Sequence, residues 1–127
     1  MVLIIRDTMA WSFTQDSPVY LQIAKRIIMS VLAGEYTAGE QIPSVRQLAL
    51  EAAVNPNTVQ HAFQELEDEG IIISKGTMGR FVTEDTEVIN RCRIKQAEQL
   101  VKNFVSQAKR LSVPKEHIFT MLEEEME

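Results

Sequence analysis

The sequence predicts a mainly α-helical chain with one small β-hairpin, and three observations support that prediction. Apolar residues recur at spacings of three and four over most of the chain, which is typical of amphipathic helices. Two β-prone runs, 71–74 and 80–83, are joined by five residues that include Gly76 and Gly79, as a hairpin tip requires. Hydrophobic residues make up 45% of the chain and charged residues 24%, so a folded core is expected and disorder is not.

The first helix is predicted to follow Ser17. This serine suits an N-cap and Pro18 suits the first helical position, while Gly34 suits the end of the helix. The apolar positions at helical spacing are Tyr20, Ile23, Ile27, Ile28, Val31 and Leu32.

Two short helices separated by a tight turn are predicted next. Ser44 begins a capping box with the glutamine three residues later, and this helix runs to about Ala53. Asn55 can cap the following helix and Pro56 can open it, and Gly70 ends it. Helix, turn, helix, turn, helix and hairpin in this order predict a winged helix-turn-helix domain over residues 1–83.

Residues 84–127 are predicted to form a two-helix C-terminal dimerisation tail. Its first helix runs to about Leu111, and Pro114 opens its second. An apolar seam repeats about every seven residues, and its members are Ile94, Ala97, Val101, Phe104, Ala108 and Leu111, broadened by Leu100 and Val105. We expect this seam to pack against a second copy of the chain, although it could instead fold back on the winged domain or on the final helix.

Charge and composition restrict the possible functions. The net charge is −5, and residues 1–83 carry six basic and nine acidic side chains, so any DNA footprint must come from local placement of charge. Cys92 is the only cysteine, and with two histidines it cannot form a four-ligand zinc site, so we expect neither a metal nor a cofactor. The apolar run at residues 1–5 is too short for a signal peptide or a membrane span, which predicts a cytoplasmic protein without a membrane partner.

Several motifs in a fixed order resemble the N-terminal domain of the GntR family of bacterial regulators. They cover residues 18–82 almost without gaps and are PVYLQI at 18–23, Gly34 and Gly39, PSVRQLA at 43–49, VNPNTV at 54–59, ELE at 65–67 with Gly70, and GRFV at 79–82. The short tail is similar to that of the YtrA subfamily, which implies a dimeric protein and often a repressor.

The third helix would be the recognition helix, entering the major groove with its N-terminal residues foremost. Asn57, Thr58, Gln60 and His61 are placed there to meet bases and phosphates, because amides can pair with an adenine edge and threonine can reach phosphate or a thymine methyl group. The alternative for Asn57 and Thr58 is that they only cap the helix.

Three further groups complete the predicted DNA surface. By resemblance, Arg46 approaches DNA next to Ser44, with a surface ion pair to Glu40 or Glu51 as the alternative. The hairpin offers a basic and polar tip that could touch phosphates or the minor groove, namely Lys75, Gly76, Thr77, Gly79 and Arg80. Arg80 could instead be structural.

The recognition helix departs from the family pattern, because Pro56, Gln60 and His61 occupy positions where arginines are frequent. Fewer permanent charges should weaken nonspecific binding, and whether His61 makes binding tighter at lower pH stays open.

The sequence thus predicts a sequence-specific DNA-binding transcription regulator that binds an inverted-repeat operator as a homodimer. Among regulators, a repressor is favoured over an activator. The alternative is a winged-helix protein-interaction module, whereas an enzyme is not expected because no nucleophile, phosphate loop or metalloprotease motif is present. Whether a small-molecule effector exists stays open.

Overall fold

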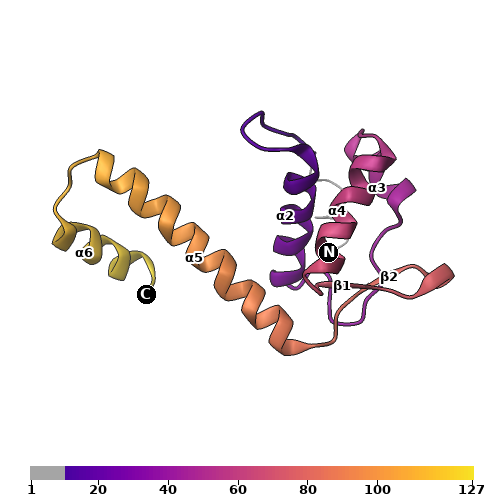
Figure 1. Cartoon of the computed structure of the whole chain (residues 1–127). Helices are drawn as coiled ribbons and strands as arrows, with labels where there is room; N and C mark the ends of the chain where they lie inside the picture. Colours follow the sequence, from indigo (N-terminus) through magenta and orange to yellow (C-terminus); the bar gives the residue numbers. More distant parts are fainter. Residues whose placement is uncertain (1–10) are drawn as a thin grey trace. The chain divides into compact units, whose positions relative to one another are not determined.

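A computed structural model describes residues 11–127 and has the predicted mainly α architecture with one hairpin (Figure 1). The elements are α2 (Val19–Leu32), α3 (Val45–Ala52), α4 (Pro56–Asp68), β1 (Ile72–Ser74), the 3₁₀ turn η1 (Gly76–Met78), β2 (Arg80–Val82), α5 (Thr86–Arg110) and α6 (Lys115–Glu125). The chain forms two compact units, one ending at Asn90 and one beginning at Arg91. The apolar run at 1–5 lies outside the described residues.

The two short helices begin as their capping residues predict. Ser44 Oγ accepts a hydrogen bond from the backbone N–H of Gln47 at 3.1 Å, which is the serine half of the capping box. Asn55 Oδ1 accepts one from the backbone N–H of Asn57 at 2.8 Å, and Pro56 occupies the first turn of α4. Both predicted helix starts are confirmed.

The predicted start of the first helix is wrong by one residue. Pro18 is the N-cap of α2, with the extended backbone angles φ −58° and ψ 142°, and it therefore precedes the helix. Ser17 lies further out, where its carbonyl oxygen accepts a hydrogen bond from Gln22 Nε2 at 2.8 Å. The glutamine side chain from the first turn thus reaches back to the chain that leads into α2.

The core of the winged domain is centred on α4, which packs against α2, α3 and β1. The largest fully buried side chains come from these elements and from the residue before β1, and they are Phe63, Ile23, Leu66, Ile71, Ile72 and Val59. Full burial of one such side chain contributes about 1.5 to 3 kcal/mol, so this core holds one face of α4 firmly.

The hairpin is an antiparallel pair in which Ile72 faces Val82 and Ser74 faces Arg80. Residues 39–42 pair with the other edge of β2, a connection that the sequence did not indicate. Gly39 N donates to Val82 O at 3.0 Å, Val82 N to Glu40 O at 2.8 Å, and Ile42 N to Arg80 O at 2.9 Å. The wing is therefore tied to the loop that leads into α3.

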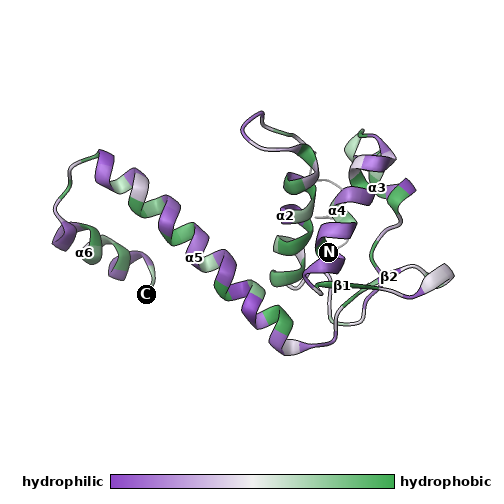
Figure 2. Cartoon of the chain, in the orientation of Figure 1, coloured by the Kyte–Doolittle hydropathy of each residue, from purple (hydrophilic) through white to green (hydrophobic). Residues whose placement is uncertain are grey.

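The second unit contains the C-terminal part of α5, together with α6. Both helices carry large apolar side chains that remain exposed in the single chain, and green bands recur along α5 in Figure 2. Pro114 is the N-cap of α6 and not its first residue, because its backbone is extended with ψ 140°. None of the helices among the described residues is long and apolar enough to cross a membrane.

Candidate nucleic-acid interface

The N-terminal end of α4 presents polar side chains at the surface. Asn57, Gln60 and His61 are exposed and Thr58 is half-buried. The core side chains of α4, beginning with Val59, occupy the other face of the same helix. This end of α4 can therefore meet a ligand without disturbing the core.

The capping function at this end belongs to Asn55 and not to its neighbours. Asn55 Oδ1 accepts a hydrogen bond from the backbone N–H of Asn57, and the Asn55 carbonyl oxygen accepts one from the backbone N–H of Thr58 at 2.9 Å. The side chains of Asn57 and Thr58 are thus not needed to cap the helix, and their contact with DNA stays a prediction.

The ring of His61 stacks on Tyr20 of α2. The ring centroids are 3.5 Å apart and the planes differ by 8°. Stacking fixes the plane of the imidazole while the residue stays exposed. The sequence indicated only that Tyr20 belongs to the apolar face of its helix, because a contact between two helices leaves no local pattern.

Arg46 lies in the first turn of α3, where it and the capping Ser44 are exposed. Among the described residues, no ion pair joins Arg46 to Glu40 or Glu51. A guanidinium beside a helix N-terminus is suited to a phosphate or a guanine edge.

The wing tip has a defined shape. Lys75 N donates to Gly79 O at 2.8 Å, and Gly76 and Gly79 have φ values of +61° and +109°, which side-chain-bearing residues rarely adopt. Gln41 Nε2 donates to Met78 O at 2.8 Å and so ties the tip to the segment before α3. The ammonium group of Lys75 lies 4.7 Å from the centre of the Phe81 ring, while Lys75, Gly76 and Thr77 are all exposed.

Arg80 has a different environment. Its Nε atom donates to Glu67 Oε1 at 2.6 Å, and the two side chains are only 23% and 22% exposed. The guanidinium carbon lies 5.1 Å from the centre of the buried Phe63 ring. This geometry supports the structural alternative for Arg80, and it also neutralises one of the carboxylates in the C-terminal half of α4.

A family model described as "Bacterial regulatory proteins, gntR family" matches residues 19–82, which run from the first residue of α2 to the last residue of β2. The chain belongs to the GntR family. It is therefore a DNA-binding transcription regulator and not an enzyme.

Two HTH-type transcription regulators of Bacillus subtilis are similar in sequence. The HTH-type transcriptional regulator YhcF is 35% identical over 106 residues, covering 84% of this chain and 88% of YhcF. The HTH-type transcriptional repressor YtrA is 39% identical over 72 residues, covering 57% of this chain and 55% of YtrA.

A solved GntR family regulator from Listeria monocytogenes has a similar structure. It superposes with a TM-score of 0.80 at 37% identity, and the match covers 88% of this chain and 98% of that chain. The winged fold and the tail that follows it therefore occur together in another GntR regulator of similar length.

Proposed function

We propose that this GntR regulator is a cytoplasmic, homodimeric repressor that recognises an inverted-repeat operator. Each α4 places its N-terminal residues in the major groove, and the two copies meet successive grooves on one side of the duplex. The observation that carries the proposal is the exposed polar end of α4, whose cap is supplied by Asn55. Arg46 is also exposed, at the start of α3.

The proposed base contacts come from Asn57, Thr58 and Gln60, with His61 at the edge of the groove. Asparagine and glutamine amides can pair with adenine, and one well-formed bidentate pair contributes roughly 1 to 3 kcal/mol of discrimination. Arg46 and Ser44 approach the phosphates or a guanine next to α3.

The wing contributes a further contact. Lys75 and the backbone of Gly76, Thr77 and Gly79 contact phosphate. Arg80 instead holds the wing against α4 through its hydrogen bond to Glu67. Since residues 1–83 carry more acidic than basic groups, the nonspecific affinity of one subunit is low, and pairing of two subunits supplies useful affinity.

The proposed subunit contact is the apolar seam of the tail. Six of its eight residues are large hydrophobics that stay exposed in the single chain, with exposed fractions of 58% for Ile94, 70% for Leu100 and 72% for Leu111. Phe104 and Val105 are 41% and 40% exposed. At ~25 cal/mol per Å², burial of six such side chains contributes on the order of 10 kcal/mol before ordering costs, which is enough to decide the oligomeric state.

Repression is supported by the similarity to YtrA, which is described as a transcriptional repressor. A dimer seated on an operator that overlaps a promoter blocks polymerase by steric exclusion.

The proposal is tested by selecting bound sequences from random duplexes with the full chain and measuring its mass in solution. We expect an enriched palindrome and a mass of two chains. Phe104→Asp should give a monomer and lose the palindrome, whereas Ser106→Asp, on the exposed surface of α5 outside the seam, should change neither. Recovery of no preferred duplex at low salt would favour a protein-interaction module instead.

A further inference from the structure

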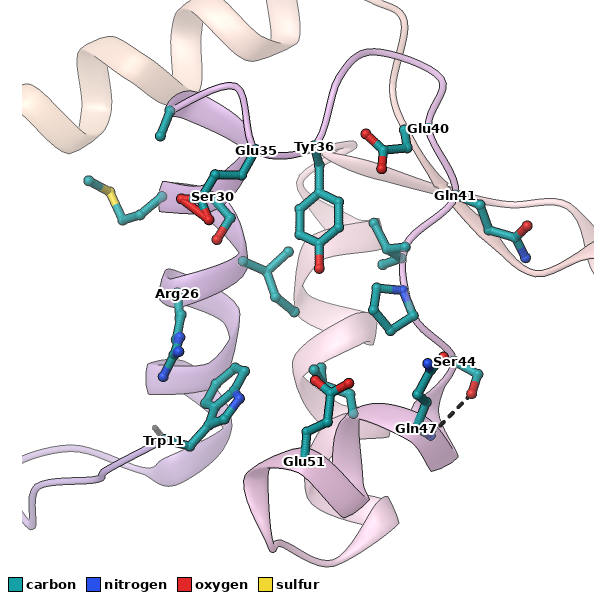
Figure 3. A pocket seen from close by; sticks show the side chains of 16 residues that line it. Trp11, Arg26, Ser30, Glu35, Tyr36, Glu40, Gln41, Ser44, Gln47 and Glu51 are labelled. Carbon is teal, nitrogen blue, oxygen red and sulfur yellow. Dashed lines mark hydrogen bonds between the residues drawn. The ribbon is translucent and has the colours of Figure 1, made fainter. Parts of the chain in front are cut away.

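The winged domain contains a cavity between α2, residues 33–43 and α3 (Figure 3). Its volume is about 740 Å³, within the range of ~300 to 1,000 Å³ that is common for small-molecule sites. Ile27, Ile42 and Leu48 supply an apolar part of its lining.

The charged groups at the cavity are mostly acidic. The carboxylates of Glu35, Glu40 and Glu51 line it together with one guanidinium, that of Arg26. Among the described residues, the carboxylates of Glu35 and Glu51 have no cationic partner, whereas Glu40 Oε1 accepts a hydrogen bond from Thr37 N at 2.9 Å. This excess of negative charge favours a cationic ligand and disfavours an anionic one.

Two aromatic rings narrow the class of cation further. Trp11 lies beneath Arg26, whose guanidinium carbon is 3.9 Å from the ring centre, and Tyr36 extends its ring into the cavity in Figure 3. Aromatic faces attract organic cations and stack on flat ones. A bare metal ion is a poor fit, because no group of three or more metal-binding side chains occurs in residues 11–127.

The cavity is connected to two of the elements that are proposed to contact DNA, α3 and the wing. Ser44 and Gln47 line it and are joined by the capping hydrogen bond of α3, with Arg46 between them in the chain. Gln41 also lines it, and its side chain holds the carbonyl of Met78 at the wing tip. A ligand in the cavity therefore touches residues that position Arg46 and the wing.

We propose that this cavity binds a small organic cation with a flat apolar body, and that the bound cation alters DNA binding through α3 and the wing. Binding of the cation is a property of the protein without DNA, whereas its effect on DNA binding rests on the proposed function.

Binding is tested on the full chain without DNA, with benzamidinium as the probe and neutral benzamide of the same shape as its comparison. Trp11 is the only tryptophan, so its indole N–H gives a single assignable signal in a ¹H–¹⁵N spectrum. We expect a saturable shift of that signal and of the Ser44 and Gln47 amides, with benzamide binding about tenfold more weakly because two carboxylates no longer assist. Equal binding of the two probes, or no saturable shift, would overturn the proposal.

Charge-neutral variants identify the site. Glu51→Gln and Glu35→Gln should each weaken the binding of benzamidinium roughly threefold. Glu69→Gln removes a carboxylate of the winged domain that does not line the cavity, and it should leave the affinity unchanged. Unchanged affinity in both cavity variants would place the probe elsewhere and contradict the assignment.

The coupling between cation binding and DNA binding is then measured as retention of the chain on duplex DNA. Retention in the presence of benzamidinium is compared with retention in the presence of benzamide, with sodium chloride added to give the same ionic strength. We expect a change of about fivefold or more, and in Glu51→Gln the same change should need about threefold more benzamidinium. Equal retention under both conditions would refute the coupling while leaving the binding result intact. Absence of any retention, even without probe, would instead refute the proposed function.

Discussion

The Arg80 and Glu67 pair allows a stability prediction that also separates the two roles considered for Arg80. Replacing each residue by methionine keeps a long apolar stem and removes the charge. The pair has an Nε to Oε1 distance of 2.6 Å and side chains 23% and 22% exposed, so it falls between an exposed ion pair, worth ~0.2 to 1 kcal/mol, and a buried charged hydrogen bond, worth ~1.5 to 3 kcal/mol.

We therefore expect a coupling free energy of about 1.5 kcal/mol in the double-mutant cycle of Arg80→Met and Glu67→Met. Arg80→Met alone should cost about 2 kcal/mol, because its guanidinium also lies 5.1 Å from the Phe63 ring centre. Glu67→Met should cost about 1.5 kcal/mol, and the double variant should be no less stable than Arg80→Met.

The assay is urea unfolding at one fixed chain concentration, because the proposed subunit association would make the midpoint concentration-dependent. With a slope of about 1.5 kcal/mol per M, Arg80→Met should lower the midpoint by more than ~1 M. A coupling below about 0.5 kcal/mol would refute the structural role of the pair and leave Arg80 available for phosphate contact.

Two further outcomes are expected. Asn55→Ala should lower the free energy of unfolding in urea titrations by about 1 kcal/mol through loss of the cap. Asn57→Ala should leave stability unchanged and should reduce the discrimination between operator and mismatched duplex in competition binding. The reverse pattern would contradict the assignment of Asn55 as the cap and Asn57 as the base contact. Lys75→Gln should reduce the slope of log affinity against log salt by about one, and an unchanged slope would remove the wing from the phosphate contacts.

The parts of the fold that were predictable from the sequence are those encoded by neighbouring residues. Ser44, Asn55 and Pro56 each act within one helical turn, so their types and spacing indicate where α3 and α4 begin. The prediction from Ser17 was wrong because a serine before a proline is only a local preference for capping. In the structure the Ser17 carbonyl oxygen accepts a hydrogen bond from the Gln22 side chain, and α2 begins one residue later than predicted.

The site was predictable in outline but not in its contacts. The exposed end of α4 follows from the apolar period of that helix, which leaves the polar positions on the opposite face. The stack of His61 on Tyr20, the pair of Arg80 with Glu67 and the pairing of residues 39–42 with β2 join parts of the chain that are distant in sequence, so no local pattern encodes them. The cavity beside α3 depends on three separate segments for the same reason.

Protection of guanine N7 from dimethyl sulfate on a selected duplex tests directly whether the N-terminal end of α4 enters the major groove. We expect two protected patches centred about 10 base pairs apart on one side of the duplex. Asn57→Ala should weaken both patches, and Glu65→Ala, in the C-terminal half of the same helix, should preserve them. A single patch, or protection that survives Asn57→Ala at full strength, would contradict a dimer that reads DNA with this end of α4.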